Sequence, residues 1–319
     1  MADGLITIAY GPRKYLRMAR ALALSYRRLG GRRPLAVVTD AAGAAALLGC
    51  YDLVIPVDPA LGQGVVHKLH LDRYSPFDAT LFVDSDCLFY KHPERLWRLY
   101  DRGEVSVRGW RYLTGDTDYE RDAPYEWVVD MKKFLGAAGI ARLPHFNSGA
   151  LFFRRSDRAE ALFATARAVY DRRHELGLRP FKNAPANDEP ILGIAMERCG
   201  VALDPWDPEE GMETAIRMCE PVELDVLRGR ACFRKDDGLR SPCLLHFNVD
   251  AQESLAYQRE ICRLELERAR FAGDARVRLT AGARVALARL GKAARFARRV
   301  PGRVLAHGPA GLVPGRAAG

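Results

Sequence analysis

The sequence lacks long apolar runs and paired cysteines. No stretch of its 319 residues approaches about 18 uncharged apolar residues, so we expect no segment that spans a bilayer. The seven cysteines are scattered and none forms a Cys-x-x-Cys pair, which argues against a disulfide framework and a zinc site. We therefore expect reduced thiols in a cytosolic protein. The opening residues MADGLITIAYGP contain no basic segment and no long apolar stretch, so we also expect no signal peptide.

A surplus of either charge is also missing from the first 270 residues. Ten of the 49 basic residues and one of the 40 acidic residues lie in residues 271–319, so this tail carries the whole net charge of +9. An electrically balanced globular part argues against a nucleic-acid-binding surface, and we expect no nucleic acid partner.

The basic tail has an amphipathic pattern. Between residues 277 and 300, apolar side chains recur among six arginines and one lysine. This pattern is typical of a helix that lies on an anionic membrane surface, so we expect peripheral contact at the inner face of the membrane. A disordered tail and a helix docked on the rest of the chain are the alternatives. We divide the chain into a catalytic domain (1–265) and a basic helical tail (266–319).

Short β-type runs alternate with helical patterns along the globular part. The predicted strands are LITIA, LAVVT, DLVIPV, ATLFVDSD, GALFFRR and CLLHFN. Alternation of strands and helices is typical of an α/β fold with a mainly parallel sheet flanked by helices. We expect a single domain of this kind.

Two carboxylates close the strand predicted over residues 79–86. Asp84 and Asp86 lie at its carboxyl end, the edge at which open α/β sheets bind ligands. Two like charges repel each other at this spacing. A solvated turn tolerates them, and a divalent cation turns their repulsion into attraction. The position at the sheet edge favours the cation.

Five motifs follow one another in an order that resembles metal-dependent glycosyltransferases of the GT-A fold. They are AYGPRKY, HKLHLDRYSPFDATLFVDSDCL, FNSGALFF, NDEP and LLHFN, and together they cover roughly residues 5–250. The order is most similar to the retaining group that contains glycogenin and bacterial lipopolysaccharide galactosyltransferases. A lone Asp-x-Asp is weak evidence, whereas five motifs in order are much stronger. The resemblance implies a GT-A (nucleotide-diphospho-sugar transferase) fold and a nucleotide-sugar donor, which we expect to be a UDP-sugar.

The resemblance assigns the metal ligands. It places Asp84, Asp86 and His246 on one cation, with Asp84 also near the donor ribose. Oxygen ligands with one imidazole suit Mn²⁺ or Mg²⁺. Such a cation neutralises the charge of a departing diphosphate. Taken alone, His246 would be interpreted as a packed core histidine.

The resemblance also assigns the residues that contact the donor and the sugar. Lys68 matches the family's donor-site lysine, and Tyr10 matches an early aromatic residue that stacks on the nucleobase. Asn147 offers an amide to sugar hydroxyls, and Asp188 matches the aspartate of a Gly-Asp-Gln motif close to the transferred sugar. We expect Asn147 and Asp188 to be the catalytic residues. The alternative for Lys68 is a solvated lysine, and the alternative for Tyr10 is an aromatic residue that closes a strand. For Asn147 it is an ordinary turn, and for Asp188 it is a helix N-cap.

The chain departs from this family at two places. Glu189 stands where the family has Gln, and no lysine follows His246 to meet the donor phosphate. We expect an arginine elsewhere, such as Arg154 or Arg234, to replace that lysine. The aromatic residues between Trp110 and His145 make that segment the expected acceptor wall.

The leading hypothesis is a cytosolic, metal-dependent hexosyltransferase that acts on a glycan, lipid-linked or small-molecule acceptor. Retention at the anomeric carbon follows from the resemblance alone. A catalytically silent relative that binds nucleotide or membrane is the first alternative. A haloacid-dehalogenase-type phosphatase is the second, because DSDCLF is close to the signature of that class, although three predicted strands precede it here.

Overall fold

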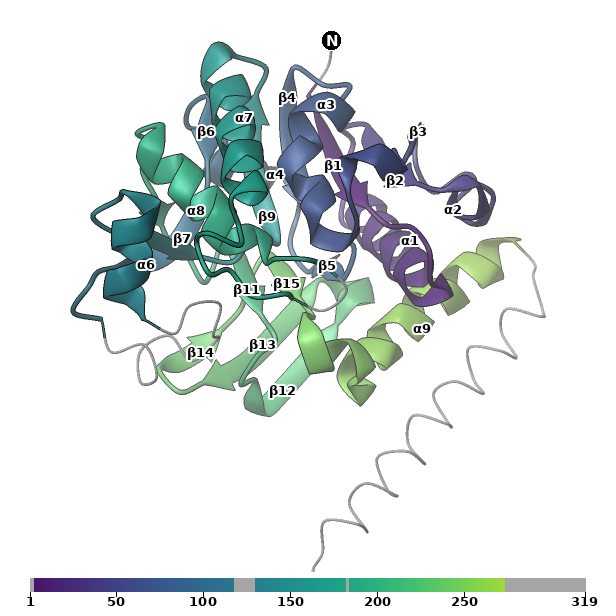
Figure 1. Cartoon of the computed structure of the whole chain (residues 1–319). Coiled ribbons are helices and arrows are strands. Elements are labelled where there is room, and N and C mark those ends of the chain that lie inside the picture. Colours follow the sequence, from purple (N-terminus) through teal and green to yellow (C-terminus); the bar gives the residue numbers. More distant parts are fainter. Residues whose placement is uncertain (1–2, 118–129, 182–183, 273–319) are drawn as a thin grey trace, which may run out of the picture.

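The computed structural model describes residues 3–117, 130–181 and 184–272 (Figure 1). Its centre is a six-stranded sheet in the order β3-β2-β1-β4-β9-β6. The strands are β1 (Gly4–Ile8), β2 (Leu35–Thr39), β3 (Leu53–Pro56), β4 (Ala79–Val83), β6 (Val105–Ser106) and β9 (Ala150–Arg154). The first four run parallel, and β9 runs antiparallel to both of its neighbours. The predicted mainly parallel sheet is confirmed.

Helices cover both faces of this sheet. They are α1 (Arg13–Arg28), α2 (Ala41–Ala46), α3 (Leu71–Tyr74), α4 (Glu94–Tyr100), α6 (Met131–Ala138), α7 (Asp157–Asp171), α8 (Asp188–Arg198) and α9 (Leu255–Ala272). Successive side chains of a strand point to opposite faces. Ile6 of β1 accordingly belongs to the core formed with α7 and α8, and Leu5 to the core formed with α1 and α4. The predicted α/β fold with flanking helices is therefore correct.

Three smaller sheets extend the molecule. The first consists of β11 (Met212–Thr214), β15 (Leu244–His246) and β5 (Cys87–Phe89), and the second of β10 (Asp204–Pro205), β7 (Arg108–Leu113) and β8 (Leu143–Phe146). The third consists of β12 (Cys219–Asp225), β13 (Arg230–Lys235) and β14 (Gly238–Arg240). The described residues also form four short 3₁₀ helices: η1 (Pro59–Leu61), η2 (Gly64–His70), η3 (Val226–Arg228) and η4 (Val249–Glu253).

Helix α9 lies beside α1 (Figure 1). Nε of Arg17 on α1 is 2.8 Å from Oε1 of Glu265, and its Nη1 is 2.6 Å from Oε1 of Gln258. The helix continues past residue 265, where we place the end of the catalytic domain, so this domain division stays a prediction. The amphipathic segment expected at 277–300 lies outside the described residues.

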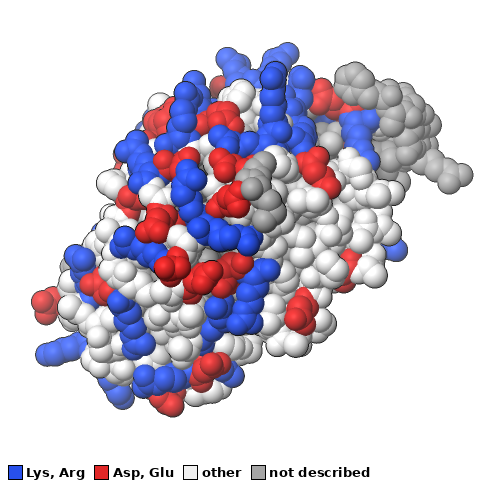
Figure 2. Space-filling view, turned by 90° about the horizontal axis from the view of Figure 1, so that it is seen from above, with Lys and Arg blue, Asp and Glu red and all other residues white. Residues whose placement is uncertain are grey.

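Charges of both signs are interspersed over the face seen from above (Figure 2), as the equal counts in the first 270 residues predict. Among the described residues, no helix combines the length and the apolar character needed to cross a membrane.

Candidate metal and donor site

The two aspartates lie in a turn between β4 and β5. β4 ends at Val83, the backbone N–H of Asp84 donates to the Gly149 carbonyl (2.9 Å), and the N–H of Cys87 donates back to the Asp84 carbonyl (3.1 Å). The carboxylates therefore sit at the carboxyl end of a parallel strand, as predicted.

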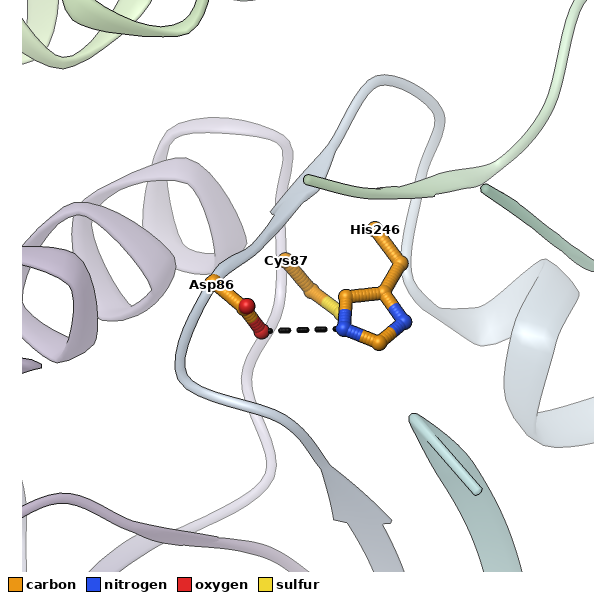
Figure 3. Close-up of side chains that lie close together, drawn as sticks. All are labelled: Asp86, Cys87 and His246. Carbon is orange, nitrogen blue, oxygen red and sulfur yellow. Dashed lines mark ion pairs between the residues drawn. The ribbon is translucent and has the colours of Figure 1, made fainter. Parts of the chain in front are cut away.

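Pairing of β5 with β15 brings His246 to this turn. The strands are antiparallel and His246 lies opposite Cys87. Nε2 of His246 is 3.0 Å from Oδ1 of Asp86 and 3.7 Å from Oδ2 of Asp84. Figure 3 shows the imidazole turned from β15 towards Asp86. Two segments far apart in the sequence, the turn with Asp84 and Asp86 and strand β15 with His246, thus bring their polar side chains together.

The other nitrogen of the imidazole is held by Asn147. Nδ1 lies 2.8 Å from Oδ1 of Asn147, whose Nδ2 donates to Oε1 of Glu189 (3.1 Å). Because the amide nitrogen donates to Glu189, the amide oxygen must accept a hydrogen bond from the N–H at Nδ1. Only a glycine fits beside this pair, since a Cβ at residue 149 would lie 2.4 Å from Nδ1.

This arrangement directs Nε2 at the carboxylates. A neutral imidazole that donates from Nδ1 has a lone pair on Nε2, the form in which histidine binds metals. Burial alone would lower the pKa of His246, but Asp86 and then Asp84 raise it above its ordinary value. The carboxylate oxygens at 3.0 and 3.7 Å from Nε2 are therefore compatible with a proton on Nε2 or, in its place, a metal ion. Ligand bonds of about 2.1 Å at near-octahedral angles separate neighbouring ligand atoms by about 3 Å. The donor types and the 3.0 Å separation of Nε2 from Oδ1 of Asp86 fit a small divalent cation.

Cys87 is the third potential ligand near Asp86 and His246, and their donor atoms lie within 4.8 Å of one another (Figure 3). Complete burial raises the pKa of the Cys87 thiol well above its ordinary value, which keeps it protonated. A metal binds the thiolate, so Cys87 is the weaker candidate. Asp84 completes the oxygen-rich set that suits Mn²⁺ or Mg²⁺.

Lys68, on η2, is buried between two acids. Its Nζ donates to Oδ2 of Asp84 (2.8 Å) and to Oγ of Ser148 (3.0 Å), and lies 3.3 Å from Oδ2 of Asp188. Burial alone would lower the pKa of Lys68, but Asp188 and then Asp84 raise it above its ordinary value. Lys68 is therefore a fixed cation and not a solvated surface lysine.

Asp188 and Glu189 open helix α8. The N-cap is Asn187, whose side chain accepts from the Glu189 N–H (3.2 Å), so Asp188 is not the cap. Oε1 of Glu189 also accepts from the Ser148 N–H (3.2 Å). Burial, followed by the nearby charge of Asp188, raises the pKa of Glu189 to about 8. Glu189, which stands where the family that the motifs resemble has Gln, thus holds the loop that carries Asn147.

All seven predicted site residues line one cavity of about 950 Å³. They are Tyr10, Lys68, Asp84, Asp86, Asn147, Asp188 and His246. The hydroxyl of Tyr10 accepts from the Gly64 N–H (2.6 Å), and its ring meets the edge of His67 at 5.2 Å between centroids. Their functional roles stay predictions.

The two arginines expected to replace the family's phosphate lysine lie elsewhere. Arg154 pairs with Asp101 and lies opposite Ala79, at the far end of β4 from the aspartates. Arg234 is exposed on β13 and does not line the cavity. Among the described residues, the Lys and Arg side chains on the cavity wall are Lys68, Arg217 and Lys235.

Sequence reasoning missed two contributors to the site. Gln252 on η4 donates from Nε2 to Oδ2 of Asp86 (2.5 Å) and so orients a proposed ligand. Arg217 lies in the loop after β11, in the left-handed backbone region (φ 56°) that non-glycine residues rarely adopt. Neither residue belongs to a local motif, so no signal in the sequence indicated them.

No family model matches the sequence, and no curated protein matches it. Solved structures similar to the chain include the galactosyltransferase LgtC with donor and acceptor sugar analogs (15% identity, 78% of this chain and 88% of that chain covered, TM-score 0.48). Mouse xyloside xylosyltransferase 1 is 14% identical over 79% of this chain and 99% of that one, with a TM-score of 0.46. The bifunctional glycosyltransferase WbbM is 11% identical, with 82% of this chain and 49% of that chain covered and a TM-score of 0.48.

All three of these structures are glycosyltransferases by name, the class that the sequence motifs resemble. Their identities do not exceed 15% and their TM-scores stay below 0.5, so we draw no conclusion about activity from them.

Proposed function

We propose that the chain is a metal-dependent glycosyltransferase that moves a sugar from a nucleotide diphosphate donor, a UDP-sugar, to an acceptor hydroxyl. The observation that carries the proposal is that Asp84 and Asp86 lie beside Nε2 of His246 on the wall of a cavity large enough for a nucleotide sugar. The orientation of His246 by Asn147 supports it further.

The three convergent residues would hold Mn²⁺ or Mg²⁺, which neutralises charge on the diphosphate when it is bound. In the net reaction the bond between the anomeric carbon and the diphosphate oxygen breaks, and its electron pair leaves with the diphosphate. The acceptor oxygen bonds to the anomeric carbon and releases its proton to the solution. Lys68 adds a second, fixed positive charge beside Asp84.

In this proposal, Asp188 and Asn147 contact the transferred sugar. Asp188 is buried and its Oδ2 has a single described partner atom within ion-pair distance, Nζ of Lys68 at 3.3 Å. A carboxylate in this position stabilises positive charge that develops on the anomeric carbon. Asn147 lies on the same wall and keeps His246 in place.

Arg217 is the cation best placed for the donor phosphates. Lys68 and Lys235 are each held by a buried acid, Lys68 by Asp188 at 3.3 Å and Lys235 by Glu213 at 2.6 Å. Arg217 has one described ion pair, a 3.8 Å contact with exposed Asp236. Its loop leaves β11 beside the metal ligand, since the N–H of Ala215 donates to the His246 carbonyl. Guanidinium binds phosphate oxygens with two parallel hydrogen bonds.

A thermal-shift screen tests the proposal. UDP with Mn²⁺ should raise the melting temperature, and either component alone should raise it much less, because the site needs both. Asp86→Asn should abolish the joint effect. Asp171→Asn, which changes an exposed acid at the end of α7, is the matched control and should keep it.

Catalysis is tested by metal-dependent hydrolysis of UDP-sugars. Joint stabilisation without hydrolysis or transfer would indicate the silent relative that binds nucleotide only. Absence of stabilisation by any nucleoside diphosphate would overturn the proposal.

We also propose a cytoplasmic location with the tail at the inner face of the membrane. The basic amphipathic pattern of residues 277–300 supports this placement.

A further inference from the structure

Three aromatic rings meet at one end of the small sheet β10-β7-β8. The ring centroid of Trp110 on β7 lies 5.0 Å from that of His145 on β8, with an interplanar angle of 54°. On its other side Trp110 meets Trp206, just after β10, at 5.2 Å and 41°. Strands β7 and β8 and the residue after β10 therefore each contribute one ring to a single cluster.

A β-bulge places Trp110 in this cluster. Gly109 pairs with Phe146 and Arg111 pairs with His145, so Trp110 is the extra residue between two ladder positions. Bulges redirect side chains and are frequent next to binding sites. Pro205 pairs with Gly109 on the other edge, which brings Trp206 alongside the bulge. The register of the sheet thus fixes the orientation of the indole.

Trp110 is 42% exposed, whereas Trp97, which lies in the core, is 1% exposed. Trp110 and His145 both line the cavity, while Trp206 supports Trp110 from outside it. Burial lowers the pKa of His145 to about 4, so its ring is neutral at physiological pH. The cavity wall therefore presents an uncharged aromatic surface held rigid by its neighbours.

This surface lies next to the proposed sugar site. His145 and Asn147 both line the cavity. They are two residues apart in sequence, a separation of about 7 Å along an extended chain. Oδ1 of Asn147 is in turn 2.8 Å from the imidazole of the proposed metal ligand. A molecule that rests on Trp110 is thus close to a sugar held at the metal.

We propose that Trp110 and His145 form a stacking surface for a pyranose ring of the acceptor. The inference rests on the proposed function and names the acceptor class of that site. One face of a pyranose ring carries mainly C–H groups and suits an aromatic face, while its hydroxyls remain free for hydrogen bonds. A flat, partly exposed indole beside polar groups provides both.

Saturation-transfer NMR tests the inference directly. The probes are methyl β-D-galactopyranoside, methyl β-D-glucopyranoside and methyl α-D-mannopyranoside, each added to the full chain with and without UDP and Mn²⁺. At least one probe should bind the wild type. Trp110→Ala should weaken that binding about tenfold or more, and Trp110→Phe by a smaller factor, because a ring is retained. Leu48→Ala, which removes another exposed apolar side chain outside the cavity, should have no effect.

The outcomes separate the inference from the proposed function. Unchanged probe binding in Trp110→Ala, or a wild type that binds none of the three probes, would overturn the stacking surface. Stabilisation by UDP and Mn²⁺ should persist in Trp110→Ala, which shows that the variant is folded and the donor site intact. A wild type that binds a pyranoside at Trp110 but never UDP with Mn²⁺ would overturn the proposed function alone.

Discussion

At the scale of single residues, a set of buried charges is stable because each has a defined partner. Lys68 lies between Asp84 and Asp188, and His246 lies between Asn147 and the aspartates. Breaking one buried pair leaves an uncompensated charge, so these residues are interdependent. Local patterns were sufficient to place Asp84 and Asp86 at the end of a strand, whereas the interpretation of Lys68 came from the resemblance of its segment to a family motif.

Glu189→Gln tests the protonation of the buried carboxyl. The pKa of Glu189 is raised to about 8 in the folded protein, above its value of about 4.3 in an unfolded chain. The stability contributed by the protonated group is therefore complete below about pH 4.3 and is lost as the pH rises through 8. We expect the wild type to lose roughly 2–4 kcal/mol of unfolding free energy between pH 5 and 8.5, at about 1.4 kcal/mol per pKa unit.

Glutamine keeps the accepting oxygen but does not ionise, so the variant should lose much less over the same range. Chemical denaturation at several pH values measures the difference. Glu175→Gln, at an exposed site, is the control and should behave as the wild type does. Parallel pH curves for Glu189→Gln and the wild type would contradict the raised pKa.

Arg217→Ala tests the proposed phosphate contact. Removing a charge-assisted hydrogen bond costs about 1.5–3 kcal/mol, so the affinity for UDP with Mn²⁺ should fall at least tenfold. The affinity for uridine, which lacks phosphate, should hardly change. Calorimetric titration of both ligands measures this, with Arg234→Ala as the matched control outside the cavity. An equal loss for uridine and UDP would argue against phosphate binding by Arg217.

At the scale of elements, strand register assembles the site. β5 and β15 pair across the chain, and this pairing alone places His246 beside Asp86. The buried strands were predicted correctly because they form continuous apolar runs. The hairpin strands β12 to β14 were not predicted, since the alternation of apolar and acidic residues over 222–225 is short and follows Pro221, which argues against a strand. Gln252 and Arg217 were missed for a related reason, because only tertiary contacts bring them to the cavity.

Arg17→Met tests how α9 supports the site from outside. Arg17 binds Glu265 and Gln258, and Gln258 in turn donates to the backbone carbonyl of Gln252, which orients Asp86. Loss of these partly buried bonds should lower the unfolding free energy by about 2 kcal/mol and reduce the thermal shift with UDP and Mn²⁺.

The control for this variant is Arg28→Met. Arg28 joins the same two helices through a more exposed 3.4 Å pair with Glu267, which is worth about 0–1 kcal/mol. If both variants unfold at the same denaturant concentration, α9 does not stabilise the site as described.

At the scale of the whole molecule, the balanced body and the basic tail have separate tasks in our account. We propose that residues 277–300 supply the membrane contact, because the first 270 residues carry equal numbers of basic and acidic residues and the tail carries the whole surplus of positive charge. Deletion of residues 273–319 should therefore abolish sedimentation with vesicles of phosphatidylserine and phosphatidylcholine. Binding by the full chain should weaken as salt rises and be absent with phosphatidylcholine alone.

The deletion should leave the thermal shift with UDP and Mn²⁺ unchanged, because the residues that line the cavity all lie within residues 8–252. Vesicle binding that survives the deletion would assign the membrane contact to the body instead.

Anomalous diffraction from a crystal soaked with Mn²⁺ and UDP tests the central claim most directly. We predict one strong manganese peak about 2.1–2.3 Å from Nε2 of His246 and from carboxylate oxygens of Asp84 and Asp86. A peak at any other position, or a peak bound by Cys87 in place of Asp84, would contradict the proposed site.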